Sequence, residues 1–189
     1  MNKSPDRQAN PSFRDSFNLA YLLVSSHAVC LTPFLHHGFG SEAFGLECIG
    51  AMVIMLIYGS EARCDAMAIF MAIWLAAVLL QRVWSAYLFR RGWRSHSRYG
   101  GYPWLAMNFP WVKTEMQALR IEPIFCLAAG ALLWTVSPAM GRFVMAGVVS
   151  LSIKHGIERQ IVEKRLRRMH DAMIEQEYLE ERFEETWRK

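Results

Sequence analysis

Residues 66–81 read AMAIFMAIWLAAVLLQ, sixteen residues without one charged side chain. A second such run, Pro123 to Gly141, follows further along the chain. A helix needs about 20 apolar residues, at ~1.5 Å each, to cross the hydrocarbon of a bilayer. In lipid, only helices and closed barrels satisfy every backbone hydrogen bond. The two runs therefore predict an all-α integral membrane protein, in which more than half of the residues are hydrophobic.

Each run has a shorter apolar neighbour, so we predict two transmembrane helical hairpins and four spans. The first hairpin covers residues 44–81 and turns at the polar link from Ser60 to Asp65, with Glu47 at the membrane edge. The second covers residues 121–156 and turns at Ser137 to Arg142. The remaining segments are a polar leader (1–16), a membrane-associated or spanning helix (17–43), a basic aromatic loop (82–120) and a helical tail (157–189).

The segment 17–43 admits two interpretations. Its run from Ser16 to Ser41 lacks Asp, Glu, Lys and Arg, which suits a fifth span. Several polar residues interrupt that run, which suits an interfacial or re-entrant helix instead. These residues are Asn18, Ser25, Ser26, His27 and Thr32, followed by Pro33. Both interpretations stay open.

The distribution of Lys and Arg predicts the orientation of the hairpins. Seven of the 21 basic residues lie in the loop 82–120 and nine follow Ile153, whereas the two short turns carry only Arg63 and Arg142. The positive-inside rule then places the loop and the tail in the cytoplasm and the turns outside. Because the basic residues flank apolar segments, the net charge of +4 indicates contact with anionic lipid headgroups. We do not expect a nucleic-acid partner.

The loop 82–120 interleaves arginine with aromatic residues. Such a mixture binds single-stranded nucleic acid by stacking and phosphate contacts. It also forms an interfacial belt at headgroup level. We favour the belt because spans flank the loop, and Gly100, Gly101 and Pro103 predict an ordered turn within it. The lipid-facing residues that we predict are Arg90, Arg91, Trp93, Arg94, Arg98, Tyr99, Trp104 and Trp111.

Groups that could carry chemistry are few. His27, Cys30, His36 and His37 come close together in the sequence, with Glu42 and Glu47 after them. They form no HxxxH, HExxH or paired-cysteine motif, and a histidine on an apolar face is commonly hydrogen-bonded to its neighbours. His96 between two serines is not a catalytic triad. We therefore predict a non-enzymatic protein with no catalytic residue, metal ligand or cofactor.

Small residues at regular spacing suggest where helices approach one another. Ala68, Ala72 and Ala76 recur every four residues, and Gly130 and Gly147 lie in the second hairpin. Small side chains let helix backbones pack closely in lipid. We expect these positions to pack within the bundle, with oligomerisation as the alternative.

The tail after Lys154 has the pattern of one long amphipathic helix, with no proline and no glycine beyond Gly156. Basic residues come first and acidic residues last, so its first half suits an anionic membrane surface. Its apolar residues recur at helical spacing and need a surface to cover them. The stripe consists of Val162, Leu166, Met169, Met173, Leu179, Phe183 and Trp187. We expect Leu166, Met169, Met173, Leu179 and Phe183 to dock a partner protein or a second copy.

These features together favour a non-enzymatic subunit or scaffold of a multiprotein membrane complex, for example in secretion or conjugative transfer. A small oligomeric channel or transporter is the first alternative. Spans without an acidic residue at mid-depth argue against an ion-coupled pump. A membrane haem or metal protein that uses His27 and His155 is the second alternative.

The orientation can be tested at Cys64, which lies on the predicted outer turn of the first hairpin. We expect an impermeant thiol reagent to label Cys64 in intact cells, with Cys64→Ser as the control that removes the signal. Labelling that requires permeabilised cells would reverse the predicted orientation.

Overall fold

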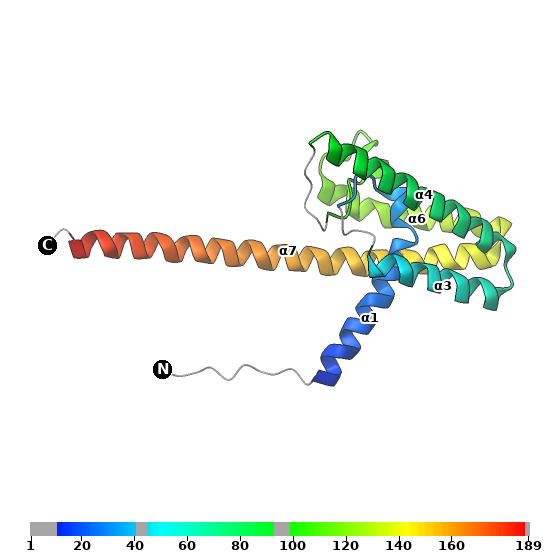
Figure 1. Cartoon of the computed structure of the whole chain (residues 1–189), viewed down its shortest axis with the longest axis horizontal. Helices are drawn as coiled ribbons and strands as arrows, with labels where there is room; N and C mark the ends of the chain where they lie inside the picture. Colours follow the sequence, from blue (N-terminus) through cyan, green and yellow to red (C-terminus); the bar gives the residue numbers. More distant parts are fainter. Residues whose placement is uncertain (1–10, 41–44, 93–98, 188–189) are drawn as a thin grey trace. The chain divides into compact units, whose positions relative to one another are not determined.

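The computed structural model describes residues 11–40, 45–92 and 99–187, and these are all-helical apart from one isolated β-bridge. The all-α prediction is confirmed. The helices are α1 (Pro11–Val29), α2 (Thr32–Leu35), α3 (Leu46–Ala62), α4 (Asp65–Arg90), α5 (Trp104–Met107), α6 (Glu115–Val136) and α7 (Pro138–Trp187) (Figure 1). The chain divides into two compact units, Met1–Lys154 and His155–Lys189, which are described separately.

Two of the described helices are long and apolar enough to cross a membrane. They are α4, with 26 residues and an 18-residue stretch of mean hydropathy 2.0, and α6, with 22 residues and an 18-residue stretch of mean hydropathy 1.5. Helix α3 has 17 residues, which is the lower end of the range for a span. The first unit is therefore a helical assembly with two candidate spans.

The helices extend beyond the predicted hairpin boundaries. Helix α4 continues past Gln81 to Arg90, and α6 begins at Glu115, so both helices extend into the predicted loop 82–120. Charged residues set the predicted boundaries, yet Arg and Gln are good helix formers and do not end a helix. The side chain of Thr114 caps α6 by accepting a hydrogen bond from the backbone N–H of Gln117. Helix α1 likewise starts at Pro11, within the predicted leader.

Pro33 explains why the segment 17–43 is not one continuous helix. Proline has no backbone N–H, and its ring clashes with the carbonyl four residues earlier, here Val29. Helix α1 ends at Val29, and α2 starts at Thr32. The orphaned carbonyl of Val29 accepts a hydrogen bond of 3.0 Å from the indole Nε1 of Trp74, which is fully buried. The break is thus stabilised from α4 and lies inside the protein.

The core of the first unit forms around this break. Its main cluster takes residues from α1, α3, α4 and the start of α7. Trp74 and Met55 are its largest fully buried side chains. The other buried members are Val29, Cys30, Phe39, Ala51, Met67, Val78, Met140 and Phe143. The end of α1, from Ser25 to Val29, therefore packs as a core element, whereas residues 15–20 and Leu23 are exposed.

The two short turns meet at one end of the first unit. The thiol of Cys64, the residue before α4, lies 3.5 Å from the hydroxyl of Ser137, which precedes α7. The Tyr58 hydroxyl also donates a hydrogen bond of 2.7 Å to the backbone carbonyl of Ala139. Away from these turns, Lys154 forms an ion pair of 2.9 Å with Glu47 in the first turn of α3. Side chains thus link the two predicted hairpins at both ends.

The small residues divide into two groups. Gly130 and Gly147 are buried; a methyl group at Gly130 would meet Met145, and one at Gly147 would meet Leu31. These two positions pack closely against neighbouring side chains in the structure. Ala68, Ala72 and Ala76 are exposed on α4, so the expectation that this row packs within the bundle is wrong. The regular spacing defines a helix face, but it does not reveal whether that face points inward.

A substitution at Gly141 tests how closely the start of α7 approaches Trp134 of α6. A Cβ atom there would lie 2.6 Å from the backbone N and Cα of Trp134, which cannot yield as a flexible side chain can. We expect Gly141→Ala to lower the free energy of unfolding in detergent by about 1–3 kcal/mol through overpacking.

Gly156→Ala is the matched control on the same helix, because nothing lies within 4 Å of its Cβ position. It should stabilise the helix by up to about 1 kcal/mol, since alanine has the higher helix propensity. A similar loss of stability in both variants would contradict the packing described for Gly141.

Candidate functional site

The predicted docking residues lie in the second unit, on the part of α7 that follows Lys154. The described residues of this unit form a single helix, and their apolar side chains are exposed except for the half-buried Ile157. The exposed members include every residue of the predicted stripe: Val162, Leu166, Met169, Met173, Leu179, Phe183 and Trp187. We call this set the docking stripe. It presents a row of apolar side chains on a charged helix, without cover within its own unit.

The first unit contains a buried ionic site. The buried face of α6 consists of Ala118, Glu122, Cys126 and Gly130, which recur every four residues. Glu122 is the charged member of an otherwise small or apolar row, and it is fully buried. Burying a carboxylate costs several kcal/mol unless it is paired and hydrogen-bonded. The carboxyl group of Glu122 therefore needs a partner, and the two side chains together form the site.

His36 provides that partner. Its Nε2 lies 2.9 Å from both carboxyl oxygens of Glu122, and its Nδ1 lies 2.8 Å from the carbonyl oxygen of Gly100. The side chain of Gln81 donates a hydrogen bond of 3.0 Å from Nε2 to the backbone carbonyl of His36. His36 thus joins α4, α6 and the segment before α5.

The hydrogen bonds of His36 restrict where its protons lie. A carbonyl oxygen can only accept, so Nδ1 carries a proton and donates it to Gly100. One further proton lies between Nε2 and Glu122. The pair is therefore either an imidazolium with a carboxylate or a neutral imidazole with a carboxylic acid. Both arrangements have zero net charge, which is what a buried site favours.

Two loop segments hold His36 in place. His37 and Tyr102 exchange backbone hydrogen bonds of 3.0 and 2.7 Å and form the isolated bridge. The N–H of Gly40 donates to the carbonyl of Tyr99. Gly101 has a φ of +87°, and a Cβ atom there would lie 2.9 Å from the Cβ of His36. The predicted glycine turn is confirmed at Gly101, where both the conformation and the close contact require glycine.

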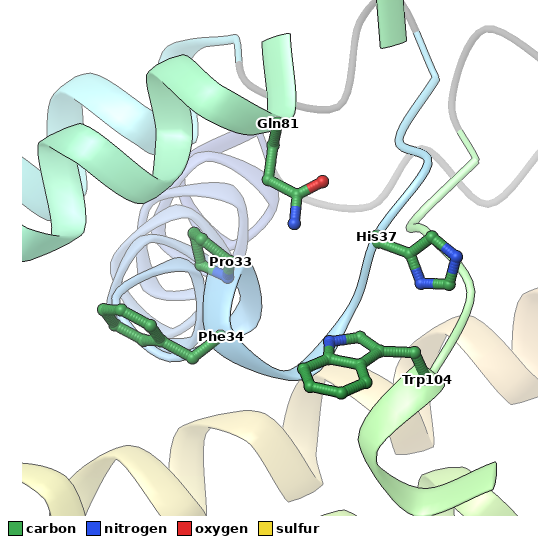
Figure 2. Close-up of a pocket in the computed structure, with 5 residues that line it drawn as sticks. All are labelled: Pro33, Phe34, His37, Gln81 and Trp104. Atoms are coloured by element: carbon green, nitrogen blue, oxygen red, sulfur yellow. The ribbon is translucent and has the colours of Figure 1, made fainter. Parts of the chain in front are cut away.

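A pocket of about 480 Å³ opens beside this site (Figure 2). Its lining residues are Pro33, Phe34, His37, Gln81 and Trp104. Figure 2 shows the Gln81 side chain reaching from α4 toward the space between Pro33 and the indole of Trp104. The volume lies in the range of small-molecule sites. Two aromatic rings and a proline make the lining largely apolar, with polar groups from His37 and Gln81.

The remaining candidate ligands have separate surroundings. His27 Nδ1 lies 3.0 Å from the Ser150 hydroxyl, and the Cys30 thiol faces the backbone carbonyls of Ser26 and Ala51. Within the described residues, His27, Cys30, His37 and Glu47 join no cluster of three ligating side chains. Glu42 and His96 lie outside the described residues. The proposed pairing of His27 with His155 stays a prediction.

The structure describes five of the eight predicted lipid-facing residues. Arg90, Arg91, Trp104 and Trp111 are exposed, as a belt requires, while Tyr99 is half-buried. Burial, together with a hydrogen bond of 3.3 Å to the Glu115 carboxylate, raises the pKa of the Tyr99 phenol. Trp93, Arg94 and Arg98 lie outside the described residues.

Glu122 is the residue that sequence reasoning missed. In the sequence analysis, Glu122 lies at the start of the second predicted hairpin, 121–156, and has no role. The sequence does contain a signal for the burial of Glu122. Ala118, Glu122, Cys126 and Gly130 recur every four residues and therefore share one face of a helix. A glutamate in a row of small residues indicates a buried carboxyl group that requires a partner. Nothing in the sequence identifies His36 as that partner, since 86 residues separate the two.

Comparison with protein-family models, with curated proteins and with solved structures found no match.

The buried pair can be tested by removing one partner. Glu122→Leu removes the carboxyl group that lies 2.9 Å from Nε2 of the buried His36 side chain. We expect it to lower the free energy of unfolding in detergent by about 3–5 kcal/mol. Glu61→Leu, at an exposed glutamate near the end of α3, should change stability by less than about 0.5 kcal/mol.

A double variant separates pairing from simple packing. His36→Phe combined with Glu122→Leu should lose less than the sum of the two single variants, because no unpaired charge remains. Strictly additive losses, or equal losses at Glu61 and Glu122, would show that the two side chains are not coupled.

Proposed function

We propose that the protein is a multi-pass membrane protein that serves as a non-enzymatic subunit or scaffold and docks a protein partner through the docking stripe. The observation that carries this proposal is the exposure of seven apolar side chains along one helix of the second unit. Exposed contiguous apolar surface in soluble regions marks interaction sites. An amphipathic helix that lies in a complementary groove is a common form of recognition.

The membrane part of the proposal rests on four helices of the first unit. Helices α4 and α6 are long and apolar enough to cross a membrane, and α3 and the start of α7 would complete two hairpins. The contact between Cys64 and Ser137 supports turns on the same side of the membrane. The excess of Lys and Arg in the loop and tail supports a cytoplasmic location for both.

Charge along the tail favours protein docking over simple adsorption to lipid. Residues 159–168 carry five basic residues and one acidic residue, so they suit an anionic surface. Residues 171–184 carry six acidic residues and one basic residue, and the same surface repels them. Met173, Leu179 and Phe183 belong to this acidic part, so a lipid surface would leave them uncovered. A protein surface can cover the whole stripe.

Met173 and its neighbour Ile174 provide a matched pair of variants. Both are apolar and similarly exposed, at 60% and 52%, but only Met173 belongs to the docking stripe. We expect Met173→Glu to remove the species that are cross-linked to the protein in native membranes, because the groove would bury an unpaired charge. Ile174→Glu should retain them, and both variants should insert normally.

Cross-linked species that survive both Met173→Glu and Leu166→Glu would contradict docking through the stripe. Loss in Met173→Glu and Ile174→Glu alike would indicate a general effect of charge on the helix.

A further inference from the structure

The pocket of about 480 Å³ plays no part in the proposed function, and most side chains around it are held in place. The Phe34 ring packs against Phe70 of α4, with ring centroids 5.7 Å apart. The His37 ring meets the ring of Tyr102 at 5.4 Å, with the two planes nearly perpendicular at 81°. Side chains that are fixed beforehand lose little freedom when a ligand binds. The pocket is therefore largely preformed, as small-molecule sites usually are.

Gln81 supplies a hydrogen-bonding amide on the α4 side of the pocket (Figure 2). Its contact of 3.0 Å with the backbone carbonyl of His36 identifies the amide nitrogen, because a carbonyl oxygen only accepts hydrogen bonds. This bond uses one N–H group and restricts the rotation of the amide. An amide carries two N–H groups and one carbonyl oxygen, so a donor and an acceptor remain for a ligand.

His37 supplies the second polar group of the pocket. Its Nδ1 atom is buried and has no hydrogen-bond partner among the described residues. Figure 2 shows a ring nitrogen of His37 on the side of the ring that faces Trp104. A buried polar atom without a partner is unfavourable, because it has lost its hydrogen bonds to water. A ligand oxygen that reaches Nδ1 would replace them.

The described lining of the pocket contains no Asp, Glu, Lys or Arg. A charged ligand would therefore leave water without gaining an opposite charge, which disfavours ions in this pocket. Phe34 is half-buried and Trp104 is 40% exposed, so both aromatic rings keep uncovered apolar surface. Aromatic rings prefer to stack with an offset or to meet edge to face with other rings. The lining thus suits an uncharged ring that also carries hydrogen-bonding groups.

The pocket lies at one end of the apolar part of α4. Gln81 is the last residue of the uncharged run 66–81, and Arg82 follows it. If α4 spans the membrane as proposed, Gln81 lies close to the level of the lipid headgroups. A lipid-soluble molecule with a polar ring reaches this level from within the bilayer. This placement depends on the proposed membrane location, whereas the polar and aromatic lining does not.

We propose that the pocket binds a lipid-soluble molecule of the quinone class, which is an uncharged flat ring with carbonyl or hydroxyl oxygens. The ring lies against Phe34 and Trp104, and its oxygens form hydrogen bonds with Gln81 and His37. Carbonyl oxygens accept hydrogen bonds, and hydroxyl groups also donate them. An amide offers both a donor and an acceptor, and an imidazole nitrogen serves as either one according to its tautomer, so the oxidised and reduced forms both fit.

Three matched probes test the proposal on the full chain in lipid nanodiscs. The first is 2,3-dimethyl-1,4-naphthoquinone, whose methyl groups block the ring positions that react with thiols, since the chain has four cysteines. The second, 2,3-dimethylnaphthalene, lacks the oxygens, and the third, anthraquinone-2-sulfonate, carries a negative charge. Equilibrium dialysis against empty nanodiscs measures their binding. We expect the neutral quinone to bind saturably, at least about tenfold more tightly than either other probe.

His37→Phe removes the ring nitrogens but keeps an aromatic ring beside Tyr102. We expect it to weaken the binding of the quinone about tenfold and to leave the binding of the hydrocarbon unchanged, because only a hydrogen bond is lost. Trp104→Leu should weaken the binding of both probes, since it removes an aromatic wall. His170→Phe is the matched control on the exposed tail, and it should bind the quinone as the wild type does.

Equal affinity for the quinone and either other probe, or no saturable binding above that of empty nanodiscs, would overturn the proposal. A His37→Phe chain that elutes like the wild type and binds the quinone as tightly would overturn it as well. If His37→Phe does not elute like the wild type, the three probes on the wild type and the Trp104→Leu variant decide. Failure here leaves the proposed docking intact, because Met173→Glu lies in the other unit and tests only the docking stripe.

Discussion

The contact between His36 and Glu122 is the constraint on which the arrangement of the first unit depends. A fully buried carboxyl group cannot stay in a helical assembly without a partner, because its desolvation costs several kcal/mol. His36 meets this need through Nε2, and Gly100 accepts from its other ring nitrogen. The position of α6 is thereby linked to the end of α2 and to the turn before α5, and Gln81 adds a contact from α4.

The broken first helix makes this contact possible. A continuous helix beyond Val29 would carry His36 away along its axis, whereas the stop imposed by Pro33 turns the chain inside the protein. Trp74 satisfies the carbonyl that the stop leaves without its helical donor. Proline lacks a backbone N–H, and an unpaired buried polar group is costly. These two effects together explain why the ionisable pair of His36 and Glu122 lies beside an apolar pocket. The docking stripe belongs to the other unit, where its apolar side chains are exposed.

Much of this fold follows from the sequence, for identifiable reasons. The runs 66–81 and 123–141 predict α4 and α6 because apolar composition and length act locally. The helix of the tail is predicted because helical spacing of apolar residues and the absence of proline are also local signals. The ends of the helices were misplaced because charge marks a change of environment, and α4 continues through that change to Arg90. The inward or outward direction of Ala72, and the pairing of Glu122 with His36, depend on contacts between distant segments, which spacing alone does not encode.

The nitrogen-15 spectrum of the His36 imidazole in the detergent-solubilised protein is the most direct test of this account. The signal can be assigned by its loss in His36→Gln. If His36 donates to Gly100 and shares a proton with Glu122, Nδ1 carries a proton at neutral pH, and its signal shows the corresponding one-bond coupling to hydrogen. An Nδ1 without a proton at neutral pH would contradict the account, because the carbonyl of Gly100 could not then accept from it.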